Sequence, residues 1–359
     1  MAETYRSPLL ARPGAAEIQA GTEIQAGTES QGLGLLDARG VAWHYGNPLT
    51  EQRDLSDRTV VIDRSHRAVI AVSGPDAPTY LNNLLSQKLD DALPGLATSA
   101  LDLDVQGHIA HHMDLSFVNG NFYLDVPAAQ ATSLHDYLTK MIFWSQVEVT
   151  RTDLAILTLL GPSVELPPVT YSREVPWPTR RVDVAVPRTE LEATADALEQ
   201  QGCELAGLMA FTAERVRALE PELGIDLDNK SIPHESAYML GHAVHLDKGC
   251  YRGQETVSRV HNLGRAPRAL VLLHLDGSVP ALPTPGSEIS AGGRTVGRLG
   301  TLVDDHELGP IALGLIKRTA LQSPDLRVGD CAVAVDPGSM PDDSAERPGR
   351  AAINRLRGL

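Results

Sequence analysis

The sequence predicts an α+β fold with a small β-barrel at its C-terminal end. Predicted strands and helices alternate without the regular strand–helix–strand repeat of a parallel sheet. Asn119-Gly120 lies between two apolar runs and is the preferred pair for a tight type I′ hairpin turn. From Arg268 onward, Gly-rich turns separate short apolar runs, a pattern typical of a small all-β barrel.

The remaining elements follow from local patterns in chain order. Pro75 starts a helix after a short apolar strand, because proline is tolerated in a first helical turn. Gly202 ends another helix, because glycine is the usual residue just past a helix end. Strands are predicted at 68–72, 109–118, 122–126, 147–149, 154–160 and 182–186, and helices at about 75–85, 128–142 and 190–201.

At 359 residues the chain is long enough for two or three domains. Residues 1–36 contain a tandem copy of Glu-Ile-Gln-Ala-Gly-Thr and too few apolar residues for a core, so they are predicted to be a disordered tail. Residues 337–359, rich in Pro, Gly and charge, are predicted to be a second flexible tail.

Composition narrows the range of functions. The net charge of −15 argues against general binding to nucleic acid, which depends on Lys and Arg at phosphates. There is no apolar run of the roughly 20 residues that a membrane helix needs, and no signal peptide pattern at the N-terminus. We therefore expect a soluble, cytoplasmic protein with no direct nucleic-acid or membrane partner.

The three cysteines, Cys203, Cys250 and Cys331, are odd in number, widely spaced and without a C-x-x-C pair. This spacing fits neither a disulfide framework nor a cysteine-based zinc site. His108, His111 and His112 lie at the start of a strand, where neighbours point to opposite faces, so no metal site is expected.

The segment Lys248 to Glu255, Lys-Gly-Cys-Tyr-Arg-Gly-Gln-Glu, carries the strongest sign of chemistry. Gly249 allows a sharp turn or a close backbone approach, and a helix is predicted to begin after Gly253 and to end at Gly264. Lys248, Arg252 and the helix dipole would favour the thiolate of Cys250, which predicts a lowered pKa for that thiol. The alternative is that Cys250 is a small buried apolar residue, the usual fate of a lone cysteine.

This segment resembles the signature of the YgfZ family of folate-binding proteins, relatives of the aminomethyltransferase (T-protein) of the glycine cleavage system. The resemblance extends over about residues 55–335. It includes the segments 72–77, 101–109, 232–235, 297–299 and 308–313.

The resemblance implies a three-domain, T-protein-like ring around a tetrahydrofolate pocket, with the cysteine loop at the cavity. It implies a folate-binding domain interleaved from 37–150 and 205–265, a small α+β domain at 151–204 and the barrel at 266–336. It also implies that the protein helps to assemble or repair the iron–sulfur clusters of client enzymes, including tRNA-modifying ones.

On this reading, Cys250 is the essential thiol and Lys248 supports it. Tyr251, Gln254 and Glu255 shape the loop and the folate site, with Gly249 and Gly253 as structural loop residues. Arg215 and Arg217 are expected to pair with folate carboxylates, and Phe211 to stack on the pterin.

Two departures from the aminomethyltransferases bear on enzymatic activity. His111 stands where those enzymes have a catalytic Asp, and Arg217 replaces the acidic residue of an Arg-x-Glu element. Both disfavour aminomethyl transfer. Three function classes remain: the thiol-dependent accessory protein, a folate-dependent C1 transferase, and a non-catalytic folate-binding scaffold.

Overall fold

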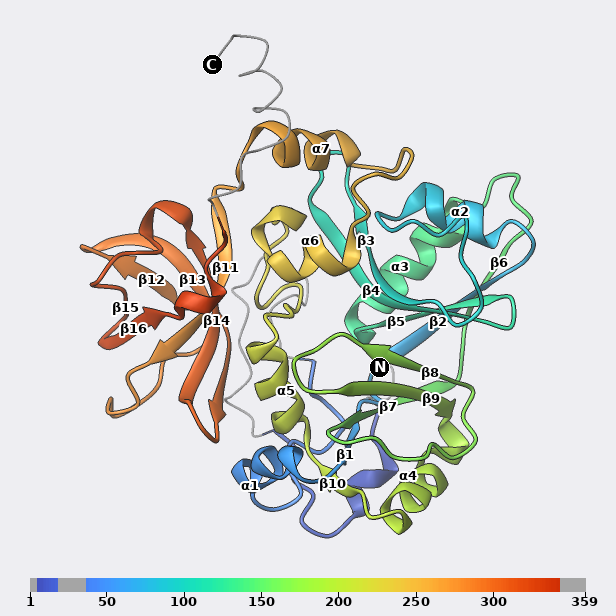
Figure 1. The fold of residues 1–359 in the computed structure, drawn as a ribbon, viewed down its shortest axis with the longest axis horizontal. Helices are drawn as coiled ribbons and strands as arrows, with labels where there is room; N and C mark the ends of the chain where they lie inside the picture. The colour runs from blue at the N-terminus through green and yellow to red at the C-terminus, as the bar shows by residue number, and fades with distance from the viewer. Residues whose placement is uncertain (1–4, 19–36, 343–359) are drawn as a thin grey trace.

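The computed structural model describes residues 5–18 and 37–342, and within them the chain forms two five-stranded sheets and a closed barrel. Figure 1 shows the barrel at one side of the molecule, the two sheets at the other, and helices α5 and α6 between them. The mixed α+β architecture with a C-terminal barrel is therefore confirmed.

The first sheet has the strand order β3-β4-β5-β2-β6 and carries α2 and α3. Its core is apolar because alternate residues of the strands point to these helices. The elements are β2 (Ala68–Ser73), α2 (Ala77–Leu84), β3 (Ala97–Leu103), β4 (Ile109–Val118), β5 (Asn121–Val126), α3 (Ala128–Lys140) and β6 (Glu148–Arg151).

The predicted hairpin joins β4 to β5, and both of its turn residues adopt positive φ, 51° at Asn119 and 82° at Gly120. Two consecutive residues with positive φ are the mark of a type I′ turn, and Asn-Gly tolerates them best. The hairpin prediction is confirmed.

The second sheet has the order β10-β1-β7-β9-β8 and packs against α4. Its elements are α1 (Pro48–Arg53), β1 (Val60–Asp63), β7 (Leu154–Leu160), β8 (Tyr171–Val175), β9 (Arg181–Pro187), α4 (Leu191–Gln200) and β10 (Glu204–Ala206). β1 precedes the first sheet in the chain but pairs with β7 and β10. The second sheet thus takes one strand from the range assigned above to 37–150.

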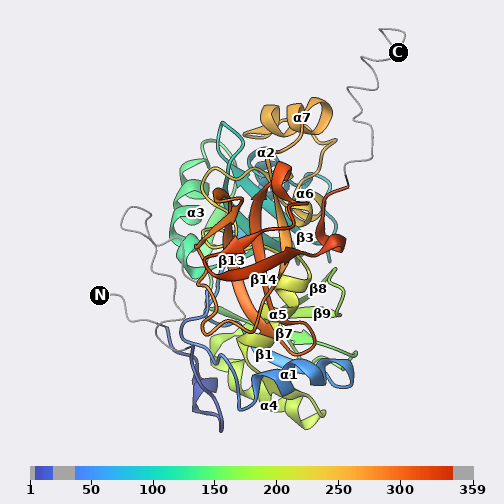
Figure 2. The same cartoon turned by 90° about the vertical axis from the view of Figure 1, so that its left-hand side faces the viewer.

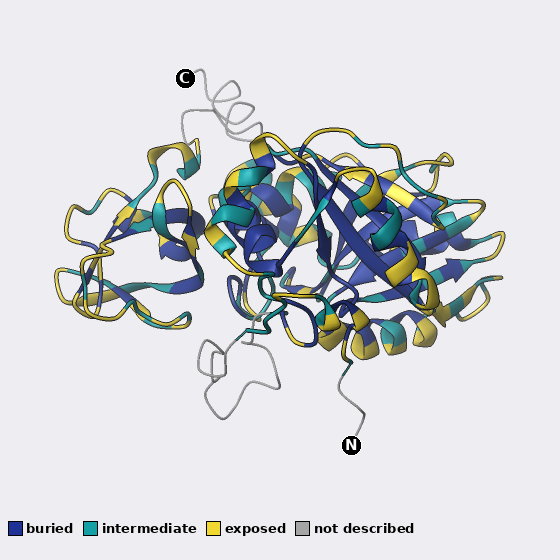
Figure 3. Cartoon of the chain, turned by 90° about the horizontal axis from the view of Figure 1, so that it is seen from below, coloured by how far each residue is buried: buried dark blue, intermediate teal, exposed yellow. Residues whose placement is uncertain are grey.

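Three helices and the barrel complete the described chain. They are α5 (Leu208–Arg217), α6 (Ala237–Ala243) and α7 (Gln254–Leu263), followed by the barrel strands β11 (Arg268–Leu275), β12 (Glu288–Ala291), β13 (Arg294–Asp305), β14 (Gly309–Lys317), β15 (Arg327–Val328) and β16 (Cys331–Val335). Figure 2 shows the barrel from the side, in front of the sheets, and Figure 3 shows the buried strands within each unit. None of the helices in the described ranges combines the length and apolar character needed to cross a membrane.

Residues 5–18 differ from the predicted disordered tail. They pack on the second sheet: Leu9 is fully buried in its core, the Ser7 hydroxyl donates to Asp63, and Ala16 bridges to His44. A single buried leucine anchors this segment, although its composition alone predicts no core. The rest of the tail prediction and most of the tandem repeat lie outside the described residues.

At the other end, residues 337–342 begin the predicted C-terminal tail but remain attached to the barrel. The backbone N–H of Leu272 donates to Ser339 Oγ at 3.0 Å. Residues 343–359 lie outside the described range.

We predict that Leu9→Ala lowers the free energy of unfolding by about 2–5 kcal/mol, because it leaves a cavity in a closed core. Urea denaturation of the full chain measures this difference. Leu93→Ala is the matched control, because Leu93 is 75% exposed and its truncation should cost less than about 0.5 kcal/mol. Equal effects of the two substitutions would show that the N-terminal segment does not stabilise the fold.

Candidate functional site

Cys250 lies in the loop between α6 and α7 and is exposed, whereas Cys203 and Cys331 are buried. The alternative of a buried, apolar Cys250 is therefore not what the structure shows. The loop is held in place by its neighbours in sequence, which turn inward and bind the first sheet.

Lys248 is buried, and its ammonium donates to three backbone carbonyls at the C-terminal end of α2. The acceptors are Asn82, Leu85 at 2.6 Å and Gln87 at 3.0 Å. A cation at a helix C-terminus satisfies carbonyls that lack helical partners. Burial lowers the pKa of Lys248 to about 8. These contacts make Lys248 an anchor of the loop, and its support of the Cys250 thiol stays a prediction.

Arg252 is likewise engaged by the first sheet. Its Nη2 lies 2.6 Å from Asp102 Oδ1, its Nε donates to the Leu103 carbonyl, and its guanidinium stacks 4.3 Å from the Tyr137 ring centroid. Both cations expected to flank Cys250 are therefore paired with protein groups.

The other signature residues shape the loop. Tyr251 is buried, with the Lys248 ammonium 4.9 Å from its ring centroid, and Gln254 Nε2 donates to the Lys248 carbonyl at 3.2 Å. Glu255 is exposed in the first turn of α7.

Gly253 shows why a glycine is needed next to α7. Its φ is 80°, and a Cβ there would lie 2.6 Å from the Asp104 carbonyl oxygen and 2.9 Å from Gly107 Cα. The loop thus packs directly on the turn between β3 and β4. Gly249 has open space around it and no positive φ, so the structure shows no such requirement at that position.

His111 does not face the interior between the domains. Its Nδ1 lies 2.8 Å from Asp102 Oδ2 and its Nε2 lies 2.8 Å from Ser133 Oγ on α3. Because side chains alternate along β4, His112 and Asp114 point to the opposite face instead. Both of these residues line a small cavity of about 20 Å³.

The three side chains expected to bind folate from α5 already have protein partners. Phe211 is buried beside Trp177, and the Arg64 guanidinium lies 4.1 Å from its ring centroid. Arg215 binds Asp226 at 2.8 Å and Thr301 at 2.6 Å, which ties α5 to the barrel. Arg217 makes a two-pronged ion pair with Asp305 on β13.

A larger cavity of about 260 Å³ lies between the first sheet, β8 and α6. None of the residues singled out in the sequence, Cys250 included, lines it. Its lining residues are Gln87, Ala97, Thr98, Ser99, Asp114, Arg173, Glu174, Val175, Pro176, Tyr238, Gly241 and His242.

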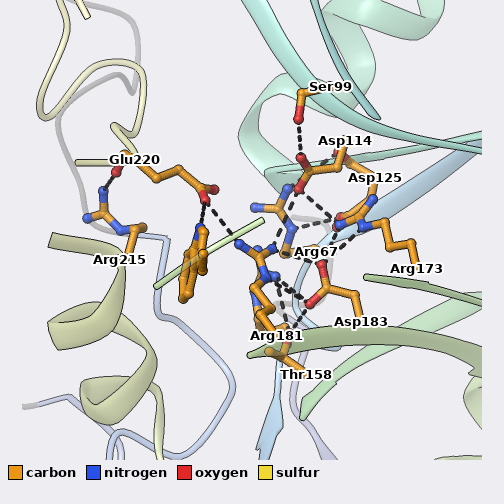
Figure 4. Close-up of polar contacts among 12 residues, drawn as sticks. Arg67, Ser99, Asp114, Asp125, Thr158, Arg173, Arg181, Asp183, Arg215 and Glu220 are labelled. Carbon is orange, nitrogen blue, oxygen red and sulfur yellow. Dashed lines mark hydrogen bonds and ion pairs between the residues drawn. The ribbon is translucent and has the colours of Figure 1, made fainter. Parts of the chain in front are cut away.

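Arg173 lies at the inner end of this cavity, within a buried network of ion pairs (Figure 4). Its Nη2 is 2.9 Å from Asp114, 2.8 Å from Asp125 and 2.7 Å from Asp183. These three carboxylates lie within 4.8 Å of one another, a spacing that a metal ion could use, but the Arg173 cation lies among them. Arg173 Nη1 is buried and has no hydrogen-bond partner within residues 5–18 and 37–342.

The network extends from Arg173 toward α5. Arg181 Nη2 binds Asp183 at 2.8 Å, and its Nη1 binds Glu220 at 3.0 Å. The arginines hold the pKa of Asp183 well below its usual range, against the opposing effect of burial. Arg67 Nε also binds Asp125 Oδ1, at 2.7 Å. No sequence motif marks this network, because its members are spread from Arg67 to Glu220 and meet only in the fold.

The sequence and the fold are similar to those of several known proteins. Residues 268–342 match the family described as CAF17, C-terminal beta-barrel domain. The solved aminomethyltransferase T of the glycine cleavage system from Bartonella henselae superposes with a TM-score of 0.70 at 20% identity, covering 80% of this chain and 88% of that one. The chain has the fold of an aminomethyltransferase.

Two curated relatives extend the match. An aminomethyltransferase from Streptomyces coelicolor is 25% identical, over 76% of this chain and 82% of its own length. A mitochondrial iron–sulfur cluster assembly factor IBA57 homolog from Neurospora crassa is 23% identical, over 80% of this chain and 69% of its own length. The chain is thus similar to aminomethyltransferases and to an IBA57 homolog, and its barrel matches the CAF17 C-terminal domain. Because one relative is mitochondrial, the cytoplasmic location remains a prediction.

We predict that Gly253→Ala lowers the free energy of unfolding by about 1–3 kcal/mol, because alanine is strained at positive φ and its Cβ meets backbone atoms. Gly249→Ala, at the residue immediately before Cys250, is the matched control and should change the stability by less than about 0.5 kcal/mol. Urea denaturation of both variants measures the two changes in the free energy of unfolding. A Gly253→Ala variant as stable as the wild type would contradict the close packing of the loop.

We predict that Arg173→Met costs about 3–5 kcal/mol at neutral pH, because it leaves buried carboxylates without their cation. Arg180→Met, at an arginine on the exposed pair with Glu174, is the control and should cost less than about 0.5 kcal/mol.

The same network predicts that the free energy of unfolding falls at acid pH. The pKa values of Asp114 and Asp183 are depressed in the fold, so their contribution is complete above the unfolded value of about 3.9 and is lost as pH falls below it. Unfolding measured between neutral pH and pH 2 should therefore show a steep loss in the wild type and a shallower one in Arg173→Met. Parallel curves would contradict this assignment.

Proposed function

We propose that this protein belongs functionally with the YgfZ family and is an accessory factor for the assembly or repair of iron–sulfur clusters in client enzymes, tRNA-modifying enzymes among them. The observation that carries the proposal is the exposed thiol of Cys250 on a loop anchored by Lys248, Tyr251 and Arg252. Thiolates are both nucleophiles and ligands of iron. The similarity to an IBA57 homolog supports the iron–sulfur context.

Aminomethyl transfer receives less support from the geometry. The position of the catalytic Asp carries His111, and that side chain turns away from the cavity toward Asp102 and Ser133. The proposal therefore contains no C1 transfer step. A pure scaffold would not need an exposed thiol held on so firmly built a loop.

Tetrahydrofolate is the proposed small-molecule ligand, in the larger cavity rather than beside Phe211. The ring of Phe211 and the guanidinium groups of Arg215 and Arg217 are taken by protein groups, so they do not fit a folate site. The larger cavity offers complementary chemistry: it is lined by Arg173, whose buried Nη1 has no hydrogen-bond partner among the described residues. A bound folate would supply a pterin edge and carboxylates for these contacts.

The test of the proposal is Cys250→Ser in a strain that lacks the chromosomal copy. We expect the activity of a cellular [4Fe–4S] enzyme to fall to the level of the deletion strain, because serine cannot supply a thiolate. Cys203→Ser is the control at a buried cysteine, with unfolding of both purified variants measured in parallel. Full enzyme activity with a folded Cys250→Ser would overturn the thiol mechanism and leave the scaffold alternative.

A further inference from the structure

Two neighbouring aromatic side chains lie almost bare on the surface of the first sheet's domain. Trp144 is 97% exposed and Phe143 is 75% exposed, in the loop between α3 and β6. Large aromatic residues usually bury most of their area, and an exposed cluster of them typically marks a contact site for another macromolecule. Tryptophan is also the residue type most enriched among the energetic centres of protein interfaces.

The loop presents these rings rigidly. Ile142 and Val147, on either side of the pair, pack against the core of the first sheet. The Gln146 backbone N–H donates to Asp76 Oδ2 at 2.7 Å. Phe143 itself adopts a φ of 38°, a left-handed conformation that costs energy for a residue other than glycine. The constrained backbone holds both rings exposed to solvent. Because the loop is already ordered, less conformational entropy is lost when a partner binds.

Helix α2 connects the aromatic pair to the cysteine loop. Asp76, just before α2, holds the aromatic loop, and the Lys248 ammonium binds carbonyls at the other end of the same helix. The eight residues of α2 span about 12 Å. Figure 1 shows α2, α3 and β6 in one domain, with α7 beyond the end of α2. A protein seated on the aromatic pair would therefore be close to Cys250.

We propose that Phe143 and Trp144 form the docking point for the iron–sulfur client protein whose cluster depends on Cys250. This inference rests on the proposed function, and the partner is a protein that presents an apolar pocket to the two rings. A net charge of −15 opposes insertion into an anionic bilayer. Self-association through this pair is disfavoured as well. The larger cavity is lined by charged groups such as Arg173 and Glu174, which do not complement the apolar indole of Trp144 from a second copy.

The first experiment compares Trp144→Ala with Cys250→Ser in the deletion strain, with a cellular [4Fe–4S] enzyme as readout. We expect both to lower its activity, while Leu308→Ala, a truncation of an exposed leucine on the barrel, leaves it unchanged. Normal activity in Trp144→Ala together with a defect in Cys250→Ser overturns the docking proposal and leaves the proposed function standing. Normal activity in both overturns the proposed function itself.

The second experiment identifies the occupant directly. A photoreactive p-benzoylphenylalanine replaces Trp144 in cells, and the same residue at position 308 is the control. We expect a cross-link from position 144 alone, to a protein that mass spectrometry identifies as an iron–sulfur enzyme or assembly factor. A product of two copies of this chain, a product with lipid, or none at all would each overturn the proposal.

Discussion

The contact of Arg173 with three aspartates joins the two sheets. Arg173 and Asp183 belong to the second sheet, whereas Asp114 and Asp125 belong to the first. Removing charges from water is costly, so such a network is no simple source of stability relative to an apolar core. What it does require is that each cation meet its carboxylates, and this fixes how the two sheets face each other. The larger cavity and the unpaired Nη1 of Arg173 both follow from that arrangement.

Much of the fold could be predicted because its signals are local. The Asn119-Gly120 turn, the strand at Leu154–Leu160 and the helix that follows Gly253 depend on residues within a few positions of one another. The pairing of β1 with β7, and the burial of Leu9 in the second sheet, depend on partners distant in sequence. The composition of residues 1–36 predicts a disordered tail because one buried leucine, Leu9, hardly changes the mean hydropathy of the whole segment.

In the candidate site, too, the local features could be predicted and the long-range contacts could not. The pattern around Cys250 identified a special loop, and the structure shows that thiol exposed. The partners of the charged residues were not predictable: Lys248 binds carbonyls of α2, and Arg215 and Arg217 bind the barrel. A Lys or Arg in a sequence does not show which group its charge will bind. In this fold protein carbonyls, hydroxyls and carboxylates bind these side chains, so they are not left for a ligand. No motif surrounds Arg173, so the sequence does not single it out. The exposed thiol and the cavity are consequently separate features, and the proposed function assigns the thiol to client proteins and the cavity to a small molecule.

We propose that the cavity beside Arg173, not the Phe211 region, receives the small-molecule ligand. Calorimetric titration of tetrahydrofolate into the wild type and Gly241→Leu tests it most directly. Gly241 lies on α6, lines the cavity and has open space around it, so leucine should fill the cavity without strain. We expect saturable one-site binding by the wild type and its loss in a stably folded Gly241→Leu. Equal binding by both proteins, or none by the wild type, would contradict it.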